Sequence, residues 1–580
     1  MNRQYDASAL GLNERQGADP AEESRNALAH AAALAAVAAL PAADPVPNVG
    51  YRSSGNTLII GKAGDALAWA GQLSGQLAVS VLLTDAEGAP AMPHAYPVFI
   101  GTGVAVKGWL GAFNVSWQAV EPDQSSAGQQ PREARFDLIL DLSEQALIDA
   151  HQPPHGYVAP GRDPSDRASA ADELVQMVGE FEKPRYFSYK ERLCAHSRNR
   201  KLGCKACIEV CSAKAIDSAG DRIKVNAHLC AGCGACTTVC PSGALGYAYP
   251  GASYTGARLR VALQAYSAAG GRHPVILFHS AQGGAALISA LASLGQSEGQ
   301  LQGLPPSVLP MQLHHSASVG LDVWLAAFCY GASGVMVLMT GEEAPQYAEA
   351  VARQMTIAQT VLSGLGYPGE HVQLVTASTP EQLDKAVWRC PRGAVPQQTA
   401  SFHLSADKRN TLDFVLDHLY RHAPVQQEQI ALPAGAPFGA VEVNVPTCSM
   451  CMACVGACPA SALLDSPTTP QLRFIEKNCV QCGLCTQTCP ENAIRLVPRI
   501  SFADTRNKEV LLNEAQPFHC IACHKPFGTQ QMIDNMLAKL SEHSVFRENL
   551  DRLRMCADCR VVDLMLTQSE VSIVEHKRQR

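Results

Sequence analysis

The sequence predicts a multidomain α+β protein in which two cysteine-rich domains are combined with α/β parallel-sheet domains. The chain has 580 residues, which is enough for several domains with buried cores. Two long segments alternate apolar strand patterns with helical patterns, as parallel sheets with crossover helices do. Sixteen of the 22 cysteines form two blocks, about 250 residues apart, that share one spacing pattern.

The composition excludes several classes of protein. A hydrophobic fraction of 47% with 17% charged residues is typical of a globular chain rather than a disordered one. A net charge of −7 disfavours nucleic acid as a partner. The cysteines lie too close together for disulfide staples, and their spacing indicates metal ligation in a reducing compartment. Because the alanine-rich stretch at residues 27–43 is too short to span a bilayer, we expect a cytoplasmic protein without a membrane span.

The first α/β domain is predicted at residues 51–150, after a flexible or helical segment at 1–50. Residues 151–190 are rich in proline, glycine and charge, then helical, and are predicted to be a linker. The elements expected in the first domain are a helix at 63–73 and strands at 57–61, 77–83 and 136–142.

A second α/β domain is predicted at residues 251–400, followed by a helix and linker at 401–440. Its alternating elements predict a small doubly wound sheet. The expected strands are 275–279, 335–339 and 371–376, and the expected helices are 321–330, 344–365 and 411–420.

The cysteine block at residues 441–495 is the more regular one. It reads Cys448-x2-Cys451-x2-Cys454-x3-Cys458-Pro, then Cys479-x2-Cys482-x2-Cys485-x3-Cys489-Pro. This is the run of a bacterial two-cluster ferredoxin, in which the fourth cysteine of each run ligates the other [4Fe-4S] cluster. The predicted ligand sets are Cys448, Cys451, Cys454 and Cys489 (the Cys454 set), and Cys458, Cys479, Cys482 and Cys485 (the Cys482 set).

The block at residues 191–250 departs from this pattern in its first half. Cys230-x2-Cys233-x2-Cys236-x3-Cys240 is regular, but Cys194-x9-Cys204-x2-Cys207-x3-Cys211 has nine residues after its first cysteine instead of two. Cys194 is therefore either a ligand or a free thiol beside a three-ligand [3Fe-4S] site. By analogy the sets are Cys211, Cys230, Cys233 and Cys236 (the Cys233 set), and Cys194, Cys204, Cys207 and Cys240 (the Cys194 set), which gives four [4Fe-4S] clusters in two ferredoxin-like domains.

The C-terminal segment at 496–580 carries two further pairs, Cys520-x2-Cys523 and Cys556-x2-Cys559, with a helix expected at 531–540. Two separated CxxC pairs fit a closed tetrahedral zinc site in a zinc-ribbon-like module. A fifth iron–sulfur cluster is the alternative.

Two glycine-containing turns invite a nucleotide-binding interpretation. Gly61-x2-Gly64 follows a strand, with Asp85 about 20 residues on, and Gly283-Gly284 follows another strand. The full dinucleotide motif is absent, so plain sheet domains are the main prediction. No nucleophile–base constellation is present, and we name no catalytic residue.

Residues 274–376 resemble the delta subunit of methyl-viologen-reducing hydrogenases. The likeness lies in Leu309-Pro310, in the helix Val319–Tyr330 and in the run Gly331–Val337. That family carries [2Fe-2S] cysteines where this chain has His314-His315-Ser316 and Thr340-Gly341-Glu342-Glu343. The resemblance implies that the fold is kept without that cluster, as a scaffold or docking surface.

The whole architecture is similar to proteobacterial 4Fe-4S polyferredoxin-type proteins associated with molybdenum- or tungsten-dependent formate dehydrogenases. The matching sequence segments begin at Cys194 (CAHSRN), Cys204 (CKACIEVC) and Cys520 (CIACHKPFG). The resemblance implies a redox protein partner, with formate dehydrogenase as the candidate.

Together these features predict an iron–sulfur electron-transfer protein that relays single electrons between redox partners. We expect an electron carrier or oxidoreductase subunit rather than a stand-alone enzyme. The alternatives are an accessory or maturation factor for a formate dehydrogenase, and a flavin- or NAD-linked reductase that uses an α/β domain.

Overall fold

The computed structural model describes residues 19–85, 95–120, 130–161, 164–297, 301–467, 469–541 and 549–566. The chain divides into two compact units, which are described separately. The first unit comprises Met1–Glu191, Ala206–Ala219 and Ile223–Pro424. The second comprises Arg192–Lys205, Gly220–Arg222 and Val425–Arg580.

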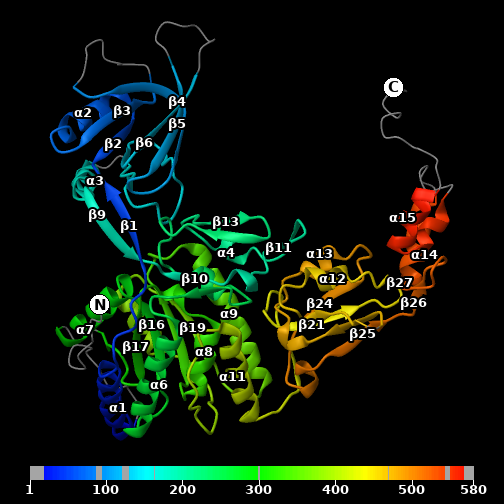
Figure 1. Cartoon of the computed structure of the whole chain (residues 1–580). Helices are drawn as coiled ribbons and strands as arrows, with labels where there is room; N and C mark the ends of the chain where they lie inside the picture. The colour runs from blue at the N-terminus through cyan, green and yellow to red at the C-terminus, as the bar shows by residue number, and fades with distance from the viewer. Residues whose placement is uncertain are drawn as a thin grey trace. The chain divides into compact units, whose positions relative to one another are not determined.

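The N-terminal sheet of the first unit has seven strands in the order β6-β5-β4-β3-β2-β7-β8 (blue to cyan in Figure 1). Strands β2 (Asn56–Gly61), β3 (Ala78–Leu83) and β7 (Leu138–Asp141) are parallel, which confirms the strands predicted there. Helix α2 (Ala63–Leu73) confirms the predicted helix. Side chains of β2 alternate between two cores, because Ile59 packs in one and its neighbours Leu58 and Ile60 in the other.

An antiparallel extension of this sheet was not predicted. It consists of β4 (Val98–Lys107), β5 (Phe113–Ala119) and β6 (Gln130–Phe136). In β5 the side chains of Phe113, Val115 and Trp117 are buried, whereas the intervening Asn114 and Ser116 are exposed. This period-two alternation is the signal from which the strand could have been predicted.

The segment at 151–190, predicted to be a linker, contributes strands to three sheets. Strand β8 (Tyr157–Val158) joins the seven-stranded sheet, and α3 (Pro164–Gln176) follows it. Strand β9 (Gly179–Pro184) pairs with β1 (Asn48–Ser53), and β10 (Phe187–Tyr189) pairs with β15 (Leu245–Tyr247). The segment is therefore part of the folded unit.

The second α/β domain is a four-stranded parallel sheet in the order β17-β16-β18-β19 (green in Figure 1). Strands β16 (Val275–Ser280), β18 (Gly334–Met339) and β19 (Val372–Thr376) confirm the predicted strands, and β17 (Val308–Leu313) is additional. The helices gather in two groups, because α7 contacts α10 and α8 contacts both α6 and α9. The helix bounds are Pro20–Ala38 (α1), Ala252–Ala268 (α6), Gly283–Ser297 (α7), Leu321–Cys329 (α8), Pro345–Gly364 (α9), Pro380–Val387 (α10) and Lys408–Arg421 (α11).

The cysteine-rich part of the first unit is small and lies between the two α/β sheets in sequence. Its elements are α4 (Ala206–Glu209), β13 (Ile216–Ala219), β14 (Arg222–Val225) and α5 (Ala235–Thr238).

The second unit contains the other cysteine-rich domain, the C-terminal module and the short hairpin β11 (Ser197–Arg198) to β12 (Lys201–Leu202). Helix α14 confirms the helix predicted at 531–540. Among the residues that the structure describes, no helix is long and apolar enough to cross a membrane. The strands are Gln429–Ala431 (β20), Gly439–Val443 (β21), Leu463–Leu464 (β22), Gln471–Phe474 (β23), Ile494–Ser501 (β24), Val510–Glu514 (β25), Pro517–His519 (β26) and Pro526–Thr529 (β27), and the helices are Ala453–Ala457 (α12), Leu484–Thr488 (α13), Gln530–Leu540 (α14) and Ala557–Leu566 (α15).

Candidate iron–sulfur and metal centres

The Cys482 set surrounds a cavity in the second unit. The cavity is walled by apolar side chains such as Leu463, Phe474 and Leu496. All four cysteines of the set line it: Cys458, Cys479, Cys482 and Cys485. Burial, and after it the neighbouring Cys479 and Cys458, raise the pKa of Cys482 to about 11. Such crowded thiolates repel one another, and bound iron would offset this repulsion.

The Cys454 set also converges. Burial raises the pKa of Cys454 to about 12, and the next causes are its neighbours Cys448, Cys451 and Cys489. Within this set Cys454 is buried, whereas Cys451 is exposed.

In the first unit the Cys233 set comes together in the same way. Burial raises the pKa of Cys236 well above its ordinary value, and Cys233, Cys230 and Cys211 add to the rise. A half-buried cation lies beside this set, because the Lys183 ammonium donates to the carbonyl oxygen of Cys230 at 2.8 Å. Burial lowers the pKa of Lys183 to about 8, and Cys230 opposes that change.

The members of the Cys194 set belong to different units. Cys207 and Cys240 are part of the first unit, and Cys194 and Cys204 are part of the second. Their common cluster therefore stays a prediction. Within the second unit the insertion folds back as the β11–β12 hairpin, so that the Cys204 N–H donates to the Ala195 carbonyl at 2.9 Å. The hairpin thus brings the chain at Cys204 back to the residue after Cys194.

Three of the four cysteine runs share a left-handed backbone on both sides of their middle cysteine. The positive φ angles are 81° and 77° at Gly232 and Gly234, 55° and 57° at Met450 and Met452, and 53° and 81° at Gln481 and Gly483. A backbone of this kind can direct successive N–H groups toward one point and form an anion-binding concavity. This gives a physical reason for the x2 spacing, because each spacer places one such residue next to the central thiolate.

In three of the four runs, the sulfur of the last cysteine accepts a hydrogen bond from the N–H of an alanine four residues later. The N–H groups of Ala215, Ala462 and Ala493 donate to the sulfurs of Cys211, Cys458 and Cys489 at 3.3, 3.2 and 3.3 Å. In the fourth run Ser242 intervenes, since its hydroxyl lies 3.7 Å from the Cys240 sulfur and accepts from the Ala244 N–H at 3.4 Å. Hydrogen bonds to ligand sulfurs are a main determinant of cluster potential.

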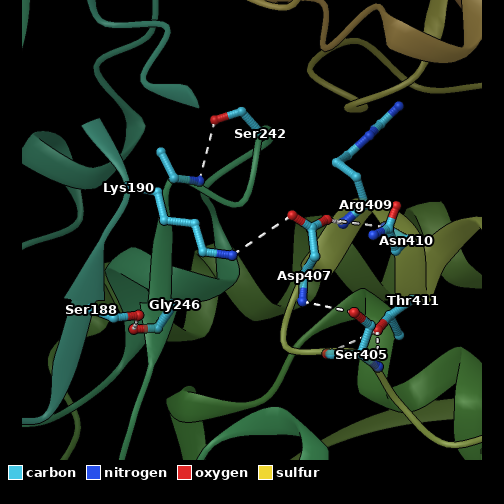
Figure 2. A network of polar contacts seen from close by, with 10 residues as sticks. Ser188, Lys190, Ser242, Gly246, Ser405, Asp407, Arg409, Asn410 and Thr411 are labelled. Carbon is cyan, nitrogen blue, oxygen red and sulfur yellow. Dashed lines mark hydrogen bonds and ion pairs between the residues drawn. The ribbon is translucent and has the colours of Figure 1, made fainter. Parts of the chain in front are cut away.

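Helix α11 anchors the segment around Cys240 within the first unit. The Lys408 ammonium donates to the carbonyl oxygens of Thr237 and Cys240, each at 3.2 Å. Figure 2 shows the adjacent Asp407 facing Lys190, with 3.7 Å between Nζ and Oδ2. Asp407 also caps α11 by accepting from the Arg409 N–H at 3.0 Å. These anchors were missed in the sequence, because a long-range contact leaves no local pattern.

The four C-terminal cysteines form a compact group. Their sulfur atoms all lie within 4.8 Å of one another, and those of Cys523 and Cys556 are 3.6 Å apart. Although burial opposes it, backbone N–H donors such as that of Cys556, at 3.3 Å, lower the pKa of Cys520 to about 6. A thiolate is thereby favoured near neutral pH, and the group could bind a metal ion.

The two glycine-containing turns considered for nucleotides are occupied by carboxylates of the chain itself. Asp85 accepts from the Ala63 N–H at 3.0 Å at the start of α2. Glu342 accepts from the Gly283 N–H at 3.1 Å at the start of α7. A phosphate group would need these same N–H donors.

The residues at the two places compared above with [2Fe-2S] cysteines have internal partners too. His314 stacks on Tyr186 with ring centroids 4.8 Å apart, and His315 accepts from the Ala317 N–H at 3.1 Å. The Glu343 carboxylate accepts from the Ser316 hydroxyl and from the Thr340 N–H, both at 2.8 Å.

Comparison with protein families identifies both cysteine blocks. Residues 202–244 and residues 447–494 each match the 4Fe-4S dicluster domain. The first match begins after Cys194, so it does not include that residue. A search of the curated proteins gives no match to the chain.

The protein therefore contains two ferredoxin-type domains that bind 4Fe-4S clusters, which supports an iron–sulfur electron-transfer role.

Proposed function

We propose that the protein relays single electrons through four [4Fe-4S] clusters between larger redox partners. The observation that carries the proposal is the convergence of the Cys233, Cys454 and Cys482 sets, each of which takes its fourth cysteine from the other half of its domain. When bound, such clusters supply one-electron transfer without rearranging the bonds of a substrate. The thiolates would hold the iron, and the N–H donors to sulfur would stabilise the reduced state.

The fourth cluster of the proposal rests on Cys194, Cys204, Cys207 and Cys240. The β11–β12 hairpin supports the inclusion of Cys194, because it closes the insertion and returns the chain to Ala195. Cys194 is itself buried.

We propose zinc for the C-terminal group. Zn–S bonds of about 2.3 Å in a tetrahedron place the sulfurs about 3.8 Å apart. The 3.6 Å separation of the Cys523 and Cys556 sulfurs agrees with this value. A [4Fe-4S] cluster places four irons between its ligands and needs wider spacing, which disfavours a fifth cluster here.

We propose a formate dehydrogenase as the partner, in the cytoplasm. This proposal rests on the resemblance in the sequence segments that begin at Cys194, Cys204 and Cys520. The carboxylates of Asp85 and Glu342, which occupy the helix N-termini, argue against a flavin- or NAD-linked reductase.

Anaerobic co-purification of the untagged partner, followed by reduction of the mixture with formate, tests the proposal. We expect the visible absorbance of the iron–sulfur clusters to bleach on addition of formate. The control replaces Cys451 with serine, which should slow or abolish bleaching of the Cys454 set. If the clusters are never reduced, yet the partner fails to assemble when this protein is deleted, an accessory or maturation role is correct instead.

A further inference from the structure

Lys183 on strand β9 lies against the loop that leads into the Cys233 set. Its ammonium donates to the carbonyl oxygens of His228 and Cys230, at 2.6 and 2.8 Å. The direction of both hydrogen bonds is fixed, because an ammonium group only donates and a carbonyl oxygen only accepts. The hydroxyl of Tyr51 on strand β1 donates to the same His228 carbonyl at 2.7 Å.

Strands β1 and β9 hold Lys183 and Tyr51 as a pair. Val49 is the residue directly opposite Lys183 in the antiparallel register, so Tyr51 is its diagonal neighbour on the same face. The Lys183 Nζ lies 5.2 Å from the centroid of the Tyr51 ring, which is a cation–π contact. On the other side of the loop the Trp109 ring stacks on the His228 ring, with centroids 4.7 Å apart at 10°. The ammonium is therefore held in one place.

The loop that receives Lys183 is itself tightly closed. The side-chain oxygen of Asn226 accepts from the N–H groups of His228 and Leu229, at 3.0 and 3.4 Å. The Cys230 N–H donates to the Asn226 carbonyl at 3.1 Å. These bonds fix the two carbonyl oxygens to which the ammonium donates.

The charge of Lys183 is not neutralised by a carboxylate. Among the residues that the structure describes, none forms an ion pair with it. The adjacent Glu182 lies on the opposite face of β9, because side chains alternate along a strand, and it accepts from the Asn48 side chain at 2.6 Å. The positive charge is thus directed at the cysteine run.

We propose that the Lys183 ammonium acts as a fixed positive charge beside the cluster of the Cys233 set and raises the reduction potential of that cluster. The inference rests on the proposed function, since it requires iron at this set. Reduction adds one negative charge to a cluster, and a nearby cation stabilises that charge. The pair of strands β1 and β9 would then set the order in which the clusters accept electrons.

The test is an EPR-monitored redox titration of the anaerobically purified full-length protein and its Lys183→Met variant. Methionine keeps an unbranched side chain and removes the charge. We expect one midpoint potential to become more negative and the others to stay unchanged. Lys183→Arg keeps the charge and should leave that potential close to the unmodified value; a shift as large as in Lys183→Met would contradict the proposal.

Tyr51→Phe is the matched control. It removes the other donor to the His228 carbonyl and leaves the ammonium in place. We expect its midpoint potentials to equal those of the unmodified protein. If Tyr51→Phe moves the same midpoint as far as Lys183→Met does, the effect comes from the packing of the loop, and the role of the charge is overturned.

Iron analysis of the same samples separates the possible failures. Iron content near four clusters with no shift in Lys183→Met would overturn the role of Lys183 and leave the proposed function standing. Iron far below that content in the unmodified protein would overturn both.

If Lys183→Met itself loses iron, Lys183→Gln becomes the deciding variant. Its amide keeps an N–H donor for the loop and removes the charge. A more negative midpoint in Lys183→Gln supports the proposal, and an unchanged potential contradicts it.

Discussion

At the scale of single residues, the same few contacts recur around the dicluster cysteines. A residue with a left-handed backbone conformation lies on each side of Cys233, Cys451 and Cys482. In three of the four runs an alanine N–H donates a hydrogen bond to the sulfur of the last cysteine. The ligand sets are predictions from spacing alone, because three of the four cysteines of each regular set lie in one short loop. The contacts of Tyr347 with Ser212 and of Lys408 with Thr237 could not be predicted, because each joins residues more than a hundred positions apart.

The C-terminal group gives the first prediction at this scale. Cys520→Ser should remove about one zinc per chain and leave the iron content unchanged, because a structural site closes only with all four ligands. Elemental analysis of zinc and iron in the same sample is the measurement. Cys390→Ser is the control, because Cys390 has no partner at ligand spacing. This variant should keep both its zinc and its iron. Loss of iron in Cys520→Ser would instead identify a fifth cluster.

Cys194 gives the second prediction. Replacement by serine should convert one cluster to a [3Fe-4S] form or lose it, since three cysteines of the set remain. EPR of the oxidised protein detects this form directly. The unmodified protein should lack the signal, and its presence there at full occupancy would mean that Cys194 is a free thiol.

At the scale of elements, apolar runs predicted the parallel strands and most helices, as in β2, β16 and α8. These elements are buried on both faces, so their sequences are continuously apolar. Strands β4 to β6 and β9 are amphipathic or half-exposed, and their assignment depends on pairing partners elsewhere in the chain. That is why residues 151–190 were mistaken for a simple linker.

The cap of α11 gives a prediction at this scale. Asp407→Ala removes the acceptor of the Arg409 and Asn410 N–H groups and the ion pair with Lys190. Loss of such a cap costs about 1 kcal/mol of local stability, which is about fivefold faster amide exchange. Hydrogen exchange over the first turns of α11 measures it. Asp407→Asn keeps the cap and should stay close to the unmodified protein; equal acceleration in both variants would assign the effect to the ion pair.

At the scale of the whole molecule, each unit holds its cysteine loops through contacts with a different neighbouring element. In the first unit the Tyr347 hydroxyl of the second α/β domain contacts the Ser212 hydroxyl, next to Cys211, and α11 supplies Lys408. In the second unit the C-terminal module is attached beside the Cys454 set, because the Thr529 hydroxyl donates to the Ser449 carbonyl at 3.0 Å. Both supports hold cysteine loops in place, as an electron relay with little reorganisation requires.

The proposed function requires four complete [4Fe-4S] clusters bound by sixteen cysteines. Iron and acid-labile sulfide, quantified together with the Mössbauer spectrum of anaerobically purified full-length protein, test it most directly. We expect about sixteen irons and sixteen sulfides per chain, with the spectrum of [4Fe-4S] clusters. Iron far below that content after reconstitution, or zinc at the dicluster cysteines, would contradict it.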